Sequence, residues 1–145
     1  VDVPDIPWYQ ALAASYSGDA YSYWDEDDCS YPGHTISVAA DGDAKTVTFT
    51  NFDAFAVGNG FPSVITGAYD EATRTVTVEI SADGVFDVGL AAAGVMGVPM
   101  DNNFDAVGSF SIAFSSDYTK MVVQPYGCYG GGWYEIYYQT EYTAN

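Results

Sequence analysis

Basic residues are scarce in this chain. Its 145 residues include three basic side chains (Lys45, Arg74 and Lys120) against 20 acidic ones, which gives a formal net charge of −17. A negative field of this size repels nucleic-acid phosphates and anionic membranes, so neither is an expected partner. Three explanations of the acidity stay open: a solvated shell that keeps the protein soluble, cation binding, and adaptation to high salt.

Histidine and long apolar runs are also nearly absent. His34 is the single histidine, and no Gly-x-Ser-x-Gly turn exists to place a serine nucleophile beside it. The sequence has no set of cysteines and histidines that could bind zinc. The most apolar stretch, 85–100, is broken by Asp87 and Pro99 and is too short to cross a bilayer. We therefore expect a protein that is not an enzyme, has no cofactor unless it binds calcium, and has no membrane-spanning segment.

The N-terminal residues lack the pattern of a secretory signal. No basic region precedes an apolar one, so a signal peptide was either absent or removed. Residues 1–15 are expected to form an extended leader and a short helix, with Pro7 near the first turn. Residues 16–145 are expected to form one β-barrel domain, because a chain of this length that is 48% hydrophobic can bury a core.

Two cysteines, Cys29 and Cys128, bracket most of the β-rich part of the chain. Cys29 ends the aromatic stretch 21–29, and Cys128 opens the stretch 128–138. If these stretches are the first and last strands of an antiparallel sheet, the two cysteines lie at the same end of adjacent strands. We therefore expect a Cys29–Cys128 disulfide that pins a closed barrel. Such a bond would indicate an extracytoplasmic location: secreted, cell surface or periplasmic.

Alternation of apolar and polar residues, the pattern of half-buried strands, dominates the chain beyond its N-terminal part. Clear examples are 34–39 and 46–50, which flank the hairpin signal Asp41-Gly42. Similar segments follow at 63–69, 75–80, 108–114, 118–124 and 133–142. The sequence therefore predicts an all-β chain, an antiparallel up-and-down barrel of about eight strands with a short N-terminal helix. A two-sheet β-sandwich is the alternative.

Residues 85–106 fit this pattern least well. They could hold one strand at 85–90, followed by an irregular loop of small apolar residues. Long loops in compact domains are often functional. We consider two arrangements: the loop folds over the mouth of the barrel as a lid, or it plugs one end of the core.

Asp101, Asn103 and Asp105 form a candidate calcium site. They match the opening Asp-x-Asn-x-Asp of an EF-hand loop, in which oxygen ligands at alternating positions converge on one ion. The match then ends, since Ala106 stands where the loop needs glycine and Ile112 where it needs glutamate. The alternative is turn chemistry, because Asp and Asn cap turns with their own side chains.

Alternate residues of the last expected strand form a candidate ligand-binding face: Trp133, Glu135, Tyr137 and Gln139. An aromatic platform beside a carboxylate and an amide suits a sugar ring. Glycoside hydrolysis by Glu135 would need a second carboxylate, which the sequence does not pair with it. The alternative is an ordinary outward strand surface, with the core taken by the other alternate residues: Tyr134, Ile136, Tyr138 and Tyr142.

The order of strands and turns resembles the small calycin-like (lipocalin-like) β-barrel domains of surface and periplasmic lipoproteins of Bacteroidetes. The segments that carry the resemblance are 16–21, 46–52, 69–78 and 131–134. The resemblance implies a barrel and an extracytoplasmic location, and it transfers no catalytic residue. Gly18 is followed by Asp19 and Ala20, so the lipocalin Gly-x-Trp is absent and transport of a small hydrophobic ligand is not expected.

These observations favour a non-catalytic secreted or cell-surface domain that binds a carbohydrate or another small ligand. A second hypothesis is a structural or adhesive module of a larger surface assembly, whose acidic shell either binds calcium or maintains solubility. The third is a hydrolase that uses Glu135. We expect a monomer, and protein partners are not indicated.

Overall fold

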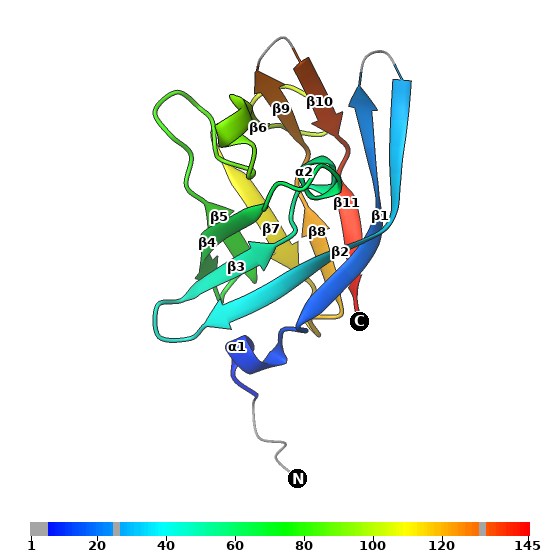
Figure 1. Cartoon of the computed structure of the whole chain (residues 1–145). Helices are drawn as coiled ribbons and strands as arrows, with labels where there is room; N and C mark the ends of the chain where they lie inside the picture. Colours follow the sequence, from blue (N-terminus) through cyan, green and yellow to red (C-terminus); the bar gives the residue numbers. More distant parts are fainter. Residues whose placement is uncertain (1–5, 25–26, 131–132) are drawn as a thin grey trace.

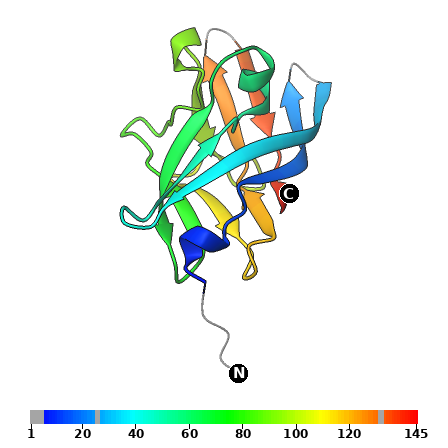
Figure 2. The ribbon, with the colours of Figure 1, turned by 60° about the horizontal axis from the view of Figure 1, so that its bottom comes forward.

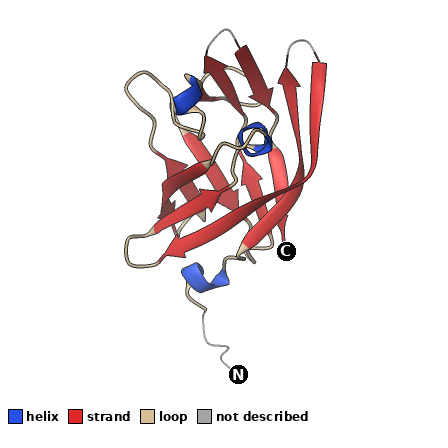
Figure 3. Ribbon diagram, viewed as in Figure 1, coloured by secondary structure: helices blue, strands red, loops and turns tan. Residues whose placement is uncertain are grey.

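The computed structural model describes residues 6–24, 27–130 and 133–145. The strands in these ranges are β1 (Ser15–Trp24), β2 (Asp27–Asp41), β3 (Thr46–Thr50), β4 (Val64–Asp70), β5 (Thr75–Val78), β6 (Met96–Pro99), β7 (Phe110–Phe114), β8 (Lys120–Val123), β9 (Tyr126–Gly130), β10 (Trp133–Tyr137) and β11 (Thr140–Ala144) (Figures 1 and 3). The helical segments are α1 (Trp8–Ala11), α2 (Ala54–Gly58) and the 3₁₀ turn η1 (Ala91–Ala93). In the described ranges, none of these helices has the length and apolar character needed to cross a bilayer.

Eight strands close into an antiparallel barrel in the order β1-β2-β3-β4-β5-β7-β8-β11, because β11 pairs back with β1. This confirms the predicted all-β barrel with a short N-terminal helix, and the two-sheet sandwich is not formed. The other three strands, β10, β9 and β6, extend the wall on one side. The long strand β1 makes this branch: Tyr16 and Ser17 pair with β11, whereas Ser22 and Tyr23 pair with β10.

Aspartates build the turns between neighbouring strands. In the β2–β3 hairpin the carboxylate of Asp41 accepts hydrogen bonds from the backbone N–H groups of Asp43 and Ala44, both at 3.0 Å. At the β4–β5 hairpin, Asp70 accepts a hydrogen bond of this kind from the backbone N–H of Ala72 (2.9 Å). Part of the acidic surface is therefore turn chemistry, as expected for Asp at the first position of a tight turn.

The apolar residues of the strands fill the barrel. Buried and more exposed residues alternate along β3, β4, β7 and β8. Large side chains with no exposed surface include Phe49, Phe110, Ile112 and Met121. Burial of each such side chain stabilises the fold by about 1.5–3 kcal/mol. The expected alternation is therefore confirmed for these strands.

The two helices lie toward opposite ends of the barrel (Figures 1 and 2). In α1, Trp8 stacks on Tyr69 of β4 with ring centroids 4.1 Å apart. In α2, Ala54 and Ala56 are buried, and the backbone N–H of Phe55 donates to the Tyr137 hydroxyl at 3.2 Å. Thus α2 covers the interior near the end from which the β1–β2 and β9–β10 hairpins project (Figure 1).

Residues 85–106 do not contain the strand expected at 85–90. Phe86 forms only an isolated bridge with Gly97 of β6, and η1 follows. Some apolar side chains of this segment are buried, including those of Val88 and Leu90, whereas those of η1 and Phe104 are exposed. Part of the segment therefore packs into the core, and its arrangement as a plug or as a lid stays a prediction.

The expected Cys29–Cys128 disulfide is not formed, and both cysteines are free. Cys29 lies on β2 and Cys128 on β9, and the sheet order places β1 and β10 between these strands. Three strand spacings correspond to about 14 Å along the sheet, whereas a disulfide needs Cα atoms within about 7 Å. The prediction was wrong because each aromatic stretch contains parts of two strands, and the cysteines lie on β2 and β9, whereas the strands that pair are β1 and β10. The extracytoplasmic location loses this support and stays a prediction.

Candidate functional site

Strand β10 places alternate side chains on opposite sides of the barrel wall. Glu135 and Tyr137 face the interior and are 0% and 3% exposed. Tyr134 and Ile136 lie on the outer side and are partly exposed. The side chain of Trp133 lies outside the described part of the chain. Glu135 and Tyr137 do share a face as predicted, but that face belongs to the core and does not form a surface platform for a sugar.

Gln139 is separated from this pair. The expected single strand over 133–142 is in fact two strands, since β10 ends at Tyr137 and β11 begins at Thr140. This step shifts the alternation, so that Thr140 and Tyr142 are buried and Gln139 is exposed. Gln139 therefore lies on the outer surface.

Glu135 is held by hydroxyl groups from three strands. Its Oε2 accepts hydrogen bonds from Ser22 of β1 (2.7 Å) and Tyr31 of β2 (2.6 Å). Its Oε1 accepts one from Tyr137 of β10 (2.8 Å). Burial raises the pKa of Glu135 above its ordinary value, and these hydrogen bonds oppose the shift only in part. Glu135 is therefore a buried carboxyl group with a stabilised protonated form.

Asp53 is a second buried carboxyl group, on the segment between β3 and α2. It is the N-cap of α2, and its Oδ1 accepts from the backbone N–H of Ala56 (2.8 Å). Its Oδ2 accepts from Tyr126 (2.8 Å) and, at 3.5 Å, from the thiol of Cys128, both on β9. Burial raises the pKa of Asp53 as well. Asp53 thereby joins α2 to the wall formed by β9.

The hydroxyl of Tyr137 connects the two carboxyl groups, which we call the buried carboxyl pair (Asp53 and Glu135). It lies 2.8 Å from Oε1 of Glu135 and 3.2 Å from Oδ1 of Asp53. Within the described part of the chain, no hydrogen bond to the pair comes from a basic side chain. Two acidic groups are therefore buried together with neutral partners alone.

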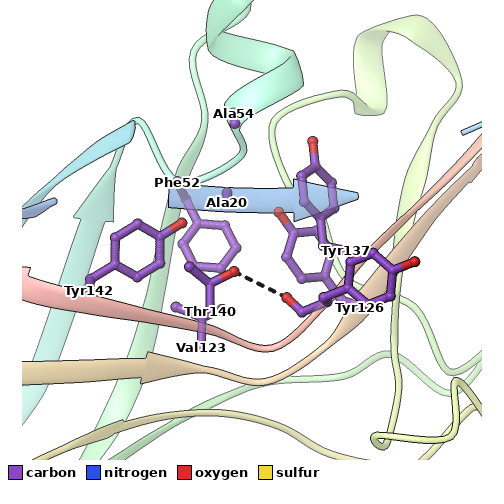
Figure 4. Close-up of a pocket in the computed structure, with 9 residues that line it drawn as sticks. Ala20, Phe52, Ala54, Val123, Tyr126, Tyr137, Thr140 and Tyr142 are labelled. Carbon is purple, nitrogen blue, oxygen red and sulfur yellow. Dashed lines mark hydrogen bonds between the residues drawn. The ribbon is translucent and has the colours of Figure 1, made fainter. Parts of the chain in front are cut away.

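A very small cavity lies beside the buried carboxyl pair. The volume open to the centre of a water molecule is about 10 Å³, which is room for about one water. Figure 4 shows the residues around it: Ala20, Phe52, Ala54, Val123, Tyr126, Tyr137, Tyr138, Thr140 and Tyr142. Since Asp53 and Glu135 have no exposed surface, neither a substrate nor a hydrophobic ligand has space at the pair in this conformation.

The outer side of the same wall carries a band of aromatic rings, which we call the aromatic face: Tyr21, Tyr23, Phe104, Tyr129, Tyr134 and Tyr138. The ring of Tyr134 on β10 lies between those of Tyr23 on β1 and Tyr129 on β9, with centroids 6.3 and 6.2 Å away. The planes of Tyr134 and Tyr129 differ by only 16°. Tyr21 and Tyr129 are 50% and 39% exposed. Three neighbouring strands thus present a continuous aromatic surface.

Phe104 and Tyr138 end the aromatic face on one side. Their rings meet edge-on at 5.2 Å. The Tyr138 hydroxyl donates to Oδ1 of Asp28 on β2 (3.1 Å), and this bond raises the pKa of Tyr138. A carboxylate and a phenol therefore lie within the band, where each can also meet a ligand hydroxyl.

A surface groove of about 310 Å³, the outer groove, adjoins this end of the aromatic face. Gln139 directly follows Tyr138, and Asp101 lies on the same turn as Phe104. The groove is lined by Met100, Asp101, Asn102, Val107, Ser111, Ala113, Val122, Gln124, Pro125 and Gln139. It combines an apolar floor with amide, hydroxyl and carboxylate groups, which is the usual composition of a small-molecule site.

The three predicted calcium ligands lie on one turn. Oδ1 of Asp101 accepts from the backbone N–H groups of Asn103 (2.9 Å) and Asp105 (3.1 Å), so this oxygen caps the turn. Among the described residues, no group of three or more His, Cys, Asp or Glu side chains is placed to hold a metal. Calcium binding stays a prediction.

No known family model, curated protein or solved structure matches this chain. The resemblance to calycin-like lipoprotein domains therefore stays a prediction. The site has to be interpreted from its own chemistry.

Sequence reasoning missed Asp53 and the aromatic face. Asp53 had one signal, because it directly precedes the apolar segment 54–57 and aspartate is a preferred N-cap residue. The aromatic face had no such signal, since Tyr134 and Tyr138 were considered only as possible core residues. Their outward position depends on the pairing of β10 with β1, which no local pattern shows.

Proposed function

We propose that this chain is a non-catalytic, extracytoplasmic domain that binds a neutral glycan across its aromatic face and outer groove. The observation that carries the proposal is the row of three tyrosine rings, Tyr23, Tyr134 and Tyr129, on adjacent strands of one wall. The C–H faces of sugar rings pack on aromatic rings, and tyrosine adds a hydroxyl at the wet edge of such a surface. The neighbouring carboxylate and amide groups can bind the sugar hydroxyls.

The charge of the chain supports a neutral ligand. With a formal net charge of −17, a polyanion such as a uronic-acid polymer or a nucleic acid would be repelled. Aromatic stacking and hydrogen bonds to neutral hydroxyls do not depend on opposite charge. Binding is therefore expected to depend only weakly on salt.

The interior is a poorer candidate for the binding site. Its cavity of about 10 Å³ holds about one water, whereas drug-sized ligands occupy pockets of about 300–1,000 Å³. The outer groove, at about 310 Å³, lies at the lower end of this range. This comparison favours the outer surface.

The proposal is tested by screening the protein against an array of neutral oligosaccharides and measuring the affinity of any that bind by calorimetry. Tyr134→Ala should weaken binding about tenfold or more, because an aromatic contact contributes up to about 1.5 kcal/mol beyond its buried area. Tyr9→Ala is the matched control, since Tyr9 is 43% exposed but lies on α1, away from the aromatic face. Equal losses in both variants, or no neutral glycan bound, would overturn the proposal.

A further inference from the structure

The buried carboxyl pair lies beneath the aromatic face, and the inference drawn from it does not depend on the proposed function. We propose that Asp53, Tyr137 and Glu135 form a proton-controlled latch that holds α2 against β9 and β10. One shared proton keeps the latch closed. Loss of that proton releases α2 and opens the interior of the barrel.

The hydrogen-bond geometry favours such a shared proton. Tyr137 has one hydroxyl hydrogen, yet its oxygen lies within hydrogen-bond distance of both Glu135 Oε1 (2.8 Å) and Asp53 Oδ1 (3.2 Å). The backbone N–H of Phe55 also points at the Tyr137 oxygen, so it supplies no hydrogen to either carboxyl group. A protonated carboxyl group can donate to the Tyr137 oxygen while Tyr137 donates to the other carboxylate. One proton on the pair therefore completes the chain.

The other contacts of the pair already have donors. These are Ser22 and Tyr31 at Glu135, and Ala56, Tyr126 and Cys128 at Asp53. With both carboxyl groups ionised, two negative charges would face a single hydroxyl hydrogen in a region without exposed surface. Such an arrangement is costly, because buried charges need paired or hydrogen-bonded partners.

The surrounding titratable groups do not relieve this charge. They are Tyr31 on β2, Tyr126 and Cys128 on β9, Tyr137 on β10 and Tyr142 on β11. Burial raises the pKa of each of them, so all stay neutral while the pair titrates. Burial also raises the pKa of both carboxyl groups of the pair. The latch is consequently closed at low pH and opens as the pH rises through the raised pKa.

Asp53 is placed so that its ionisation acts on α2. It directly precedes the five-residue helix and caps its first turn, so the Asp53 carboxylate reaches water only if α2 moves with it. Movement of α2 also uncovers Cys128, whose thiol lies 3.5 Å from Oδ2 of Asp53 and has no exposed surface in the closed state. The accessibility of the Cys128 thiol therefore measures the opening of the latch.

The test measures how fast a thiol reagent labels Cys128 in a Cys29→Ser background, where Cys128 is the single thiol. At each pH the native rate is divided by the rate in denaturant, which cancels the ionisation chemistry of the thiol itself. We expect the protection of Cys128 to fall up to about tenfold per pH unit above the pKa of the pair, because opening releases one proton.

Two variants identify the groups responsible. Glu135→Gln removes one charge, so Tyr137 can donate to an ionised Asp53, and the protection of Cys128 should fall less steeply with pH than in the parent protein. Glu141→Gln changes an exposed carboxyl group on β11 and should keep the original slope. Protection that does not vary with pH in the parent protein, or an unchanged slope in Glu135→Gln, would overturn the latch.

A measurement on the unmodified chain covers the case in which Glu135→Gln does not fold. Hydrogen exchange followed by mass spectrometry, corrected for the intrinsic pH dependence, should show faster exchange at high pH in a peptide covering 53–60. The peptide covering β4 and β5 should keep its protection. Equal loss of protection in both peptides would show global unfolding and would overturn the latch.

Discussion

The carboxylate of Asp53 performs two structural tasks at once. One oxygen caps α2 at Ala56, and the other accepts the hydroxyl hydrogen of Tyr126 on β9. The backbone N–H of Asp53 is bound as well, by Oγ of Ser63, which in turn donates to the carbonyl oxygen of Val88. A buried carboxyl group is tolerated here because its neighbours meet nearly all of its hydrogen-bonding capacity.

Asp53→Ala should lower the free energy of unfolding by about 3 kcal/mol. Loss of an N-cap contributes about 1 kcal/mol, and the buried Tyr126 hydroxyl left without an acceptor adds about 1–3 kcal/mol. Asp53→Asn keeps a capping oxygen and should cost less. The measurement is urea denaturation. Asp43→Ala changes an exposed turn residue and should stay within about 0.5 kcal/mol of the parent; a similar loss in Asp43→Ala and Asp53→Ala would contradict the prediction.

At the scale of elements, alternation identified the strands whose two faces differ. In β3, Val47 and Phe49 are buried and the threonines between them are not, so the inward face could be read from the sequence. In β10 both faces carry a tyrosine, with Tyr137 buried and Tyr134 partly exposed, so hydropathy does not distinguish the two faces. The inward face is decided by pairing with β1 and by the break before Thr140, and neither leaves a local signal.

The pairing of strands far apart in the chain could not be predicted from the sequence either. The Cys29–Cys128 prediction took 21–29 and 128–138 as single adjacent strands, but these stretches cover parts of β1 and β2 and of β9 and β10, and the strands that pair are β1 and β10. For the same reason, contact between Asp53 and Glu135 could not be predicted, because it depends on where α2 meets β10. The sequence thus predicted that Glu135 and Tyr137 share one face of a strand. It did not predict that this face is buried, or which residues form hydrogen bonds with the two side chains.

The turn at Asp101–Asp105 carries the calcium prediction, which a thermal-shift measurement decides. If Asp101, Asn103 and Asp105 bind calcium, the melting temperature should be higher with calcium than with chelator, because a ligand of the folded state alone stabilises it. Asp105→Asn should reduce the shift. Asp70→Asn alters a similar aspartate turn at the β4–β5 hairpin and should leave the shift unchanged. An absence of any shift in the parent protein would remove calcium from the site.

At the scale of the whole molecule, the barrel separates two kinds of chemistry on one wall. Strands β1, β10 and β9 point Ser22, Glu135 and Cys128 into the core, and their alternate residues form the aromatic face outside. A formal net charge of −17 surrounds both. This charge favours proton uptake by the buried carboxyl pair, because a negative field stabilises the positive proton.

The stability of the barrel should accordingly decrease as the pH rises from the acidic range. Asp53 and Glu135 have a raised pKa in the folded state, so their contribution is complete below their unfolded pKa of about 4 and is lost as the pH rises through the folded value. The exposed Asp117 acts in the opposite sense: hydrogen bonds from the side chain and backbone of Thr119 lower its pKa to about 2, so its contribution is lost only as the pH falls toward that value.

Urea unfolding at a series of pH values and constant ionic strength separates these contributions. Glu135→Gln removes one member of the buried carboxyl pair. As the pH rises, the free energy of unfolding of this variant should therefore increase relative to that of the parent. The change should be at most about 1.4 kcal/mol per pH unit, the value for one proton. The shift should end once the pair is fully ionised in the parent. In Glu141→Gln the difference from the parent should stay constant through the same range, because this carboxyl group is exposed in the folded protein. Parallel curves for the parent and Glu135→Gln would mean that the pair does not take up a proton on folding, and the stabilising role of the shared proton would be wrong.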